Sequence, residues 1–189
     1  MTHFQDGIEV GSVSSQVTVA TSAGALYHSG TAITATAAEL NRSADASARI
    51  VTTTATALSL TVTEHAERVL LVSSNSTVAN TFTLPTATGS GAKFTIVNNI
   101  AQTQGSVVVA ANGTTDVVKG LAFVVSTTEE AAAAFATSAT SDKITLNATT
   151  TGGEAAGDKI ECIDSAANTW NVTCWLGGSG TLATPFSET

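Results

Sequence analysis

From about residue 50 onward, the chain consists of short segments in which apolar and polar residues alternate. Residues 57–63 show the pattern most clearly, with leucine or valine at every second position and serine or threonine between them. A period of two residues is typical of a strand with one buried face. Similar segments recur about every 8–15 residues, separated by turns rich in glycine, asparagine or proline. This arrangement predicts an all-β fold, an antiparallel β-sandwich or barrel.

One short helix is expected among the strands. It is predicted over 127–136, because two threonines can cap it, Glu129 and Glu130 favour the positive end of its dipole, and an alanine run follows. Phe135 is its only large apolar side chain, so the helix should lie over the sheet as a small lid. Besides residues 57–63, the segments expected to form strands are 68–73, 81–85, 93–98, 105–111, 117–118, 123–125, 143–147, 159–163 and 169–175.

Residues 1–45 differ from the rest because they contain too few large apolar residues for a core. A short strand is expected within 9–20, and Thr36 and Glu39 have the spacing of a capping box that begins little more than one helical turn. Such elements are not stable alone. We therefore predict an extended N-terminal arm that orders against a partner, followed by a β domain over 46–189. The arm residues expected to bind that partner are Phe4, Ile8, Val10, Val17, Val19, Leu26, Tyr27, Ile33 and Leu40.

The composition limits the partners of this chain. Charged residues make up only 12% of the sequence, and the formal net charge is −8, with seven lysines and arginines scattered along it. Without a basic patch, binding to nucleic acid or to an anionic membrane is not expected. Roughly a third of the residues are threonine or alanine, which suits half-exposed strands. So few charges protect weakly against self-association, which favours a chain whose role is assembly.

No segment has the pattern of a catalytic, cofactor-binding or metal-binding site. Residues 89–93 resemble the end of a phosphate-binding loop, but the leading glycine, its spacing and the following helix are missing, so a hairpin turn is the better interpretation. The three histidines form no metal-binding motif. We expect no enzymatic activity, no cofactor and no metal. Seven acidic residues are assigned to the solvated surface with ordinary pKa values: Glu64, Glu67, Glu129, Glu130, Asp158, Glu161 and Asp164.

The last hairpin of the chain contains both cysteines and both tryptophans. Trp170 and Cys174 share one face by alternation, and both Trp170 and Trp175 are interpreted as core residues because the chain has so few aromatics. A three-residue loop would place Cys162 opposite Cys174, whereas a four-residue loop would place them on opposite faces. The register therefore decides whether a disulfide can form. The N-terminal residues lack a secretion signal, so synthesis in the cytoplasm and two free thiols are expected.

Two parts of the chain resemble structural proteins of tailed bacteriophages. Residues 30–41, GTAITATAAELN, are similar to a linker of tail fibres and head proteins. The remainder resembles small capsid decoration, or cement, proteins. The matching segments are residues 58–63, 82–85, 93–96, 144–147, 151–153, 157–158, 160–161, 168–170 and 178–186. The chain departs from that family at Cys174 and Trp175, where a small residue is common.

The resemblance implies a β-sandwich or barrel that forms homotrimers on the outer surface of the virion head, with an arm reaching onto the major capsid protein. Its action would be mechanical, since surface buried across neighbouring capsid subunits raises the cost of separating them. A tail-fibre or head-fibre subunit for host attachment is the alternative. A polysaccharide-binding module is a third hypothesis, from a different functional class.

Overall fold

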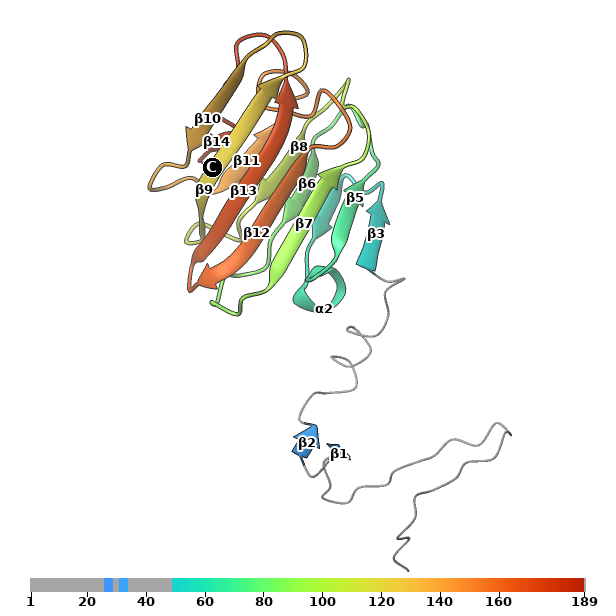
Figure 1. Cartoon of the computed structure of the whole chain (residues 1–189), viewed down its shortest axis with the longest axis vertical. Coiled ribbons are helices and arrows are strands. Elements are labelled where there is room, and N and C mark those ends of the chain that lie inside the picture. The colour runs from blue at the N-terminus through green and yellow to red at the C-terminus, as the bar shows by residue number, and fades with distance from the viewer. Residues whose placement is uncertain (1–25, 29–30, 34–48, 189) are drawn as a thin grey trace, which may run out of the picture. The chain divides into compact units, whose positions relative to one another are not determined.

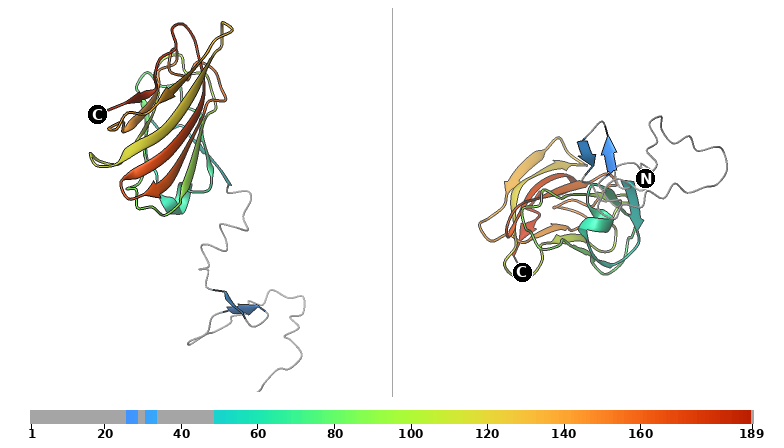
Figure 2. Two further views of the ribbon diagram at one scale, coloured as in Figure 1. Left: turned by 60° about the vertical axis from the view of Figure 1, so that its left-hand side comes forward. Right: turned by 90° about the horizontal axis from the view of Figure 1, so that it is seen from below.

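The computed structural model describes residues 26–28, 31–33 and 49–188, and the chain divides into two units, residues 1–44 and 45–189. In the first unit, β1 (Leu26–His28) and β2 (Thr31–Ile33) form an antiparallel pair. The strand expected within 9–20 and the capped turn expected at Thr36 lie outside the described residues. The second unit contains two stacked β-sheets (Figures 1 and 2).

The larger sheet has seven strands in the order β10-β9-β13-β12-β7-β5-β3, and the smaller has five in the order β14-β11-β8-β6-β4. The strands of the larger sheet are β3 (Ile50–Thr53), β5 (Val69–Val72), β7 (Lys93–Asn98), β9 (Val117–Ser126), β10 (Ala132–Ala136), β12 (Lys159–Ala166) and β13 (Thr169–Gly178). Those of the smaller sheet are β4 (Ala57–Ser59), β6 (Asn80–Thr83), β8 (Val107–Ala110), β11 (Lys143–Leu146) and β14 (Phe186–Ser187). The expected all-β sandwich is therefore confirmed.

The core lies between the two sheets and follows from the alternation within each strand. In β13, every second residue from Trp170 to Gly178 is buried, and β7 alternates in the same way. Trp170 is fully buried, as expected, and its ring meets that of Phe94 edge-on with centroids 5.5 Å apart. Phe82, from the smaller sheet, is also fully buried. Apolar side chains from both inner faces thus form one contiguous core.

The sheets are mixed, whereas purely antiparallel pairing was expected. Strands β3, β5 and β7 pair in parallel, as do β4, β6 and β8, and β13 pairs in parallel with β9. The reason is the path of the chain, which alternates between the two layers from β3 to β8. Each return to a layer restores the direction of the previous strand there, so neighbours within the layer run parallel.

The short helix is present but not where the sequence analysis placed it. Residues 127–136 form a turn followed by β10, which pairs antiparallel with β9. Phe135 packs against the core from this strand. A run of about six alanine-rich residues is a marginal helix on its own, and the open edge of β9 offers it backbone partners instead. The helix is α2 (Val62–His65), capped by the Thr61 side chain, which accepts from the Glu64 N–H at 3.2 Å.

Candidate protein-interaction surface

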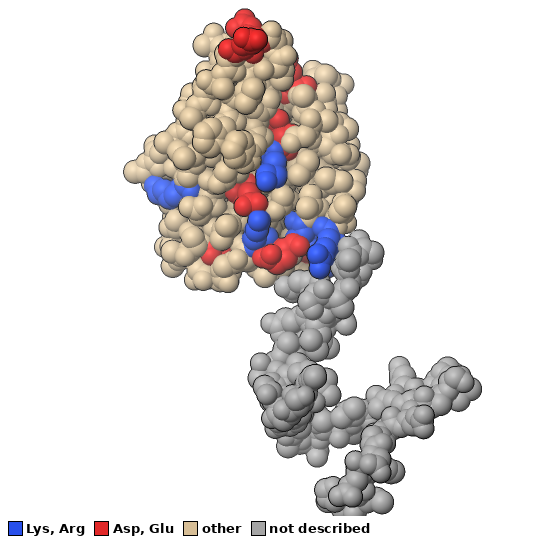
Figure 3. Space-filling model, in the orientation of Figure 1, with Lys and Arg blue, Asp and Glu red and all other residues tan. Residues whose placement is uncertain are grey.

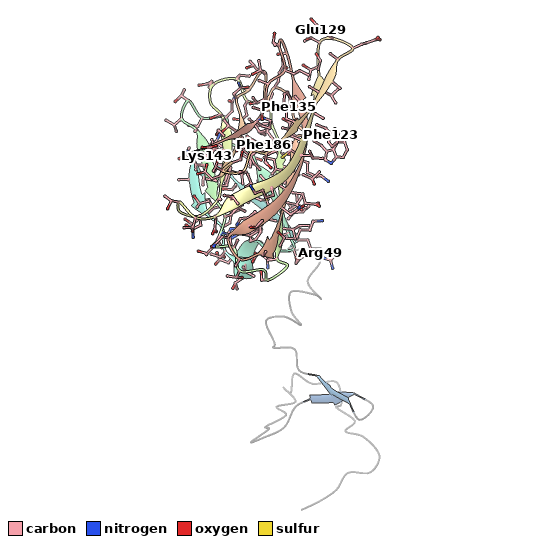
Figure 4. The ribbon with its side chains drawn as sticks, turned by 90° about the vertical axis from the view of Figure 1, so that its left-hand side faces the viewer. Arg49, Phe123, Glu129, Phe135, Lys143 and Phe186 are labelled. Carbon is pink, nitrogen blue, oxygen red and sulfur yellow. The ribbon has the colours of Figure 1, made fainter. Side chains whose placement is uncertain are left out.

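Three neighbouring strands carry apolar side chains on the outer face of the larger sheet. These residues, called the apolar face below, are Leu121, Phe123 and Val125 on β9, Ala132, Ala134 and Ala136 on β10, and Trp175 on β13. Phe123 is 37% exposed, and Val125 and Trp175 are each 53% exposed. In Figure 4, Phe123 projects from the outer face, whereas Phe135 and Phe186 lie between the two layers.

The strand register places these side chains next to one another. Phe123 of β9 lies between Ala134 of β10 and Trp175 of β13. The rings of Phe123 and Trp175 are stacked, with centroids 4.9 Å apart and planes 16° apart. The face is therefore a contiguous patch that carries an aromatic pair on its β13 side. Soluble monomers seldom expose contiguous apolar patches beyond a few hundred Å².

The sequence of β9 shows why this face differs from an ordinary solvent-facing sheet. Residues 121–125 are apolar at every position, with Ala122 and Val124 fully buried in the core and the other three side chains exposed. A strand with one solvated face alternates between apolar and polar residues, whereas a strand covered on both faces is apolar throughout. This half of β9 thus has the composition of a strand whose outer face is also covered.

Charged residues border the apolar face without entering it. Next to Trp175, β12 presents Lys159, and further along the same strand Glu161 forms an ion pair with Lys93 at 2.8 Å. Glu129 and the neighbouring Glu130 lie in the turn that precedes β10. Figure 3 shows charged side chains along the centre and lower part of this view and an acidic group at its top. The surface over much of β9 and β10 lies between them and is uncharged.

The arm residues predicted from sequence are only partly within the described structure. Leu26 and Tyr27 lie on β1 and Ile33 on β2, and the register brings Leu26 opposite Ile33. The other six, Phe4, Ile8, Val10, Val17, Val19 and Leu40, lie outside the described residues. Their proposed contact with a partner stays a prediction.

Sequence analysis missed the apolar face for two specific reasons. It interpreted Trp175 as a core residue, which is wrong, although alternation from Trp170 already placed it on the opposite face. It also divided β9 at Gly120 and assigned residues 127–136 to a helix, so Leu121, Phe123 and the alanines were never placed on adjacent strands. The unbroken apolar run at 121–125 was the signal that could have revealed the face.

Two of the seven acidic residues expected on the surface, Asp158 and Asp164, are buried instead. The Asp164 carboxylate accepts backbone N–H donors from Thr88 at 2.9 Å, Gly89 at 2.7 Å and Ser90 at 3.0 Å. It also accepts from the hydroxyls of Thr88 and Ser90. Burial alone would raise the pKa of Asp164, but the hydrogen bonds, led by that of the Ser90 hydroxyl, outweigh it and lower the pKa to about 2.

The loop that resembles a phosphate-binding segment therefore does hold an anion, but the anion is a carboxylate of the same chain. The loop is also not the expected hairpin turn, because it crosses from β6 in the smaller sheet to β7 in the larger. A free ligand has no room at donors that Asp164 already occupies. This carboxylate fixes the connection between the layers, which is a structural role.

Asp158 and the two cysteines are further groups buried in the sandwich. Burial raises the pKa of Asp158, although its carboxylate accepts from the N–H groups of Gly153 and Gly177. Cys162 and Cys174 are buried free thiols, and each pairs across the hairpin with a residue two positions from the other cysteine. Within the described residues, no group of three or more His, Cys, Asp or Glu side chains could hold a metal ion.

One cavity of about 330 Å³ lies beside β10 and β14. Its lining contains hydroxyl groups and a single carboxylate, without a histidine or cysteine beside them. The lining residues are Ala136, Ser138, Ser141, Thr184, Phe186, Ser187 and Glu188.

Comparison with protein-family models, with curated proteins and with solved structures found no match to this chain. Among the described residues, no helix is long and apolar enough to cross a membrane.

Proposed function

We propose that this chain is a non-catalytic structural subunit of a bacteriophage virion that binds the outside of the capsid and stabilises the shell. The apolar face is the observation that carries the proposal, because it is a preformed docking surface on a rigid sheet. The resemblance of the sequence to decoration proteins supplies the partner class, the major capsid protein. The location is then the outer surface of the head.

The physical chemistry of the apolar face favours a protein partner. Aromatic side chains at the centre of an interface often contribute most of its binding energy. The Phe123–Trp175 stack offers such side chains, and the alanines of β10 allow a partner to approach the backbone closely. Covering the face removes apolar surface from water, at about 25 cal/mol per Å². A capsid subunit held in this way gains a contact that must be broken before the shell opens.

Exposed stacked aromatics are also found in carbohydrate-binding sites, which is the observation that favours the polysaccharide-binding alternative. Sugar recognition needs polar groups beside the rings to hydrogen bond the hydroxyls. Here, Phe123 is bordered by Leu121, Val125 and Ala134, which cannot do so. Trp175 is bordered by Lys159 of β12, which offers donors but no acceptor. A protein surface matches this lining better.

A binding experiment with purified shells tests the proposal. Shells lacking this protein are incubated with the full chain or with Trp175→Ser, and bound protein is measured by co-sedimentation. We expect the substitution to weaken binding about 30-fold, which corresponds to about 2 kcal/mol for an aromatic interface anchor. Val78→Ser is the matched control, because Val78 is 58% exposed in a loop away from the face. Equal binding of all three proteins would contradict the proposal.

Copy number separates the two virion roles. A decoration protein occupies most capsid positions, so purified virions should contain on the order of hundreds of copies. A fibre subunit would be present at about three to eighteen copies. The lower number, measured by quantitative mass spectrometry of virions, would exclude decoration and favour the fibre alternative.

A further inference from the structure

The edge strand β10 has an open side whose backbone groups can be identified. The Ser126 N–H donates to the Ala131 carbonyl, and the Thr137 N–H donates to the Gly120 carbonyl. Hydrogen-bonded pairs alternate along an antiparallel ladder, so Ala133 and Phe135 also direct their backbone groups toward β9. Ala132, Ala134 and Ala136 direct theirs to the open edge. Among the described residues, these outward groups have no hydrogen-bond partner.

This edge lacks the features that prevent natural sheets from pairing with another chain. Monomeric proteins protect long edges with charged residues, proline or bulges. Strand β10 is five residues long, reads AAAFA, and pairs with β9 without a register shift. By contrast, β14, at the corresponding edge of the smaller sheet, has only two residues. The open edge is therefore suited to accept a further strand.

We propose that β10 pairs antiparallel with β10 of a second copy of this chain, about a two-fold axis at Ala134, so that two larger sheets become one continuous sheet. In that register, Ala132 lies opposite Ala136 of the second copy and Ala134 lies opposite its equivalent. Only alanines meet on the outer face, so no side chain obstructs the approach. The inference stands apart from the proposed function, because it concerns the sheet edge and self-association rather than the outer face and the capsid.

The charges at the two ends of β10 select the second copy and the antiparallel direction. Glu129 and Glu130 precede the strand and are exposed. At its other end, the Lys119 ammonium donates to the carbonyls of Ser138 and Ala139. Antiparallel pairing at Ala134 places residue 130 opposite residue 138, so the acids of each copy lie near Lys119 of the other. They also lie near one carboxylate there, that of Glu188, which accepts from the hydroxyls of Ser138 and Thr140. Parallel pairing would instead bring the four carboxylates together.

The pairing also extends the apolar face. Because β10 lies beside β9, a two-fold axis at Ala134 places the two Phe123–Trp175 stacks on the same outer surface, one on each side of the axis. A short edge contact buries less than a standard interface, so the pairing should be a reversible equilibrium. The expected dissociation constant is on the order of micromolar to tens of micromolar.

The experiment measures the mass of the full chain by light scattering and by sedimentation over a range of concentrations. We expect a monomer–dimer equilibrium. Ala134→Lys places like charges opposite each other on the axis and should raise the dissociation constant at least about tenfold. Val78→Lys adds the same charge in an exposed loop outside both surfaces and should leave the equilibrium within about threefold. Circular dichroism and thermal unfolding verify that both variants fold.

A charge exchange tests the register itself. Glu130→Lys should weaken the dimer, and combining it with Lys119→Glu should restore the dimer, because the opposite charges again face each other. A strict monomer at all concentrations, a trimer, or a dimer unaffected by Ala134→Lys would each overturn the proposal. Failure of the double variant to recover would overturn the antiparallel register. Shell binding is tested with Trp175→Ser, which leaves β10 and its edge unchanged, so failure of the dimer and failure of the proposed function are distinguishable.

Discussion

At the scale of single residues, Asp158 and Asp164 show how local donors decide the behaviour of a buried carboxylate. Both lie on the inner side of the sandwich, and burial by itself raises the pKa of each. Asp164 accepts three backbone N–H groups and two hydroxyls, so its ionised form is favoured. Asp158 accepts two backbone N–H groups, and burial prevails. The pKa of an aspartate is therefore raised at one of these positions and lowered at the other.

Replacing Asp164 with asparagine should destabilise the protein and change its response to acid. Asparagine has one acceptor oxygen and an amide NH2 group that would face donors, so the expected loss is about 1–3 kcal/mol in the free energy of unfolding. The folded-state pKa of Asp164 is about 2, below the ordinary 3.8. Its stabilising contribution is therefore present above pH 3.8 and is lost as the pH falls toward 2.

Urea unfolding of the native protein and of Asp164→Asn between pH 2 and pH 6 measures this effect. The variant should lose less stability on acidification than the native protein does. Parallel curves for Asp164→Asn and the native protein would contradict the assigned role.

At the scale of single elements, β9 depends on one glycine. Gly120 pairs with Val172 in the parallel contact between β9 and β13. A Cβ atom at this position would lie 1.8 Å from the Val172 carbonyl oxygen, a distance that no non-bonded pair tolerates. The residue that appeared to end a strand in the sequence instead permits a ten-residue strand to approach its neighbour closely.

Gly120→Ala should therefore separate β9 from β13 and lower the free energy of unfolding by about 3 kcal/mol or more. Gly113→Ala provides the comparison, because Gly113 has a φ of 69° and open space around its Cβ position. That variant carries only backbone strain, about 1 kcal/mol. Chemical unfolding followed by tryptophan fluorescence distinguishes the two, and equal losses would show that the close approach relaxes without cost.

Elements with a clear two-residue period and firm turns could be predicted from sequence, and the others could not. Residues 93–98 were predicted as a strand and form β7 with those bounds, because glycines precede it and alternation is regular. Strand β10 was missed because an alanine run is compatible with both helix and strand, and only the β9 edge decides between them. The layer to which each strand belongs depends on crossovers that local patterns do not encode. The apolar face was not predicted either, because it spans three strands and neither β9 nor β10 was predicted with its observed bounds.

At the scale of the whole molecule, the described sandwich takes its strands and its core from residues 50–187. Its core residues run from Leu60 to Phe186 and come from both sheets. In the described structure, every strand of the sandwich begins at Ile50 or later. The binding role of the arm predicted over 1–45 stays a prediction.

Deleting residues 1–45 should leave a folded domain that no longer binds shells tightly. Thermal unfolding monitored by circular dichroism should show a transition within a few degrees of that of the full chain, because the core is intact. Co-sedimentation with shells should show loss of binding, since the arm's contacts are absent. Full occupancy by the shortened chain would refute the role of the arm.

The parallel contact between β9 and β13 also sets when the Phe123–Trp175 pair can form. Phe123 and Trp175 are opposite in the register but 52 positions apart in the chain. The aromatic pair therefore exists only after the ribosome has added β13 and after the two distant strands have met. A partial chain released earlier carries one ring without the other. The stacked pair of the apolar face therefore requires both strands to be present and paired.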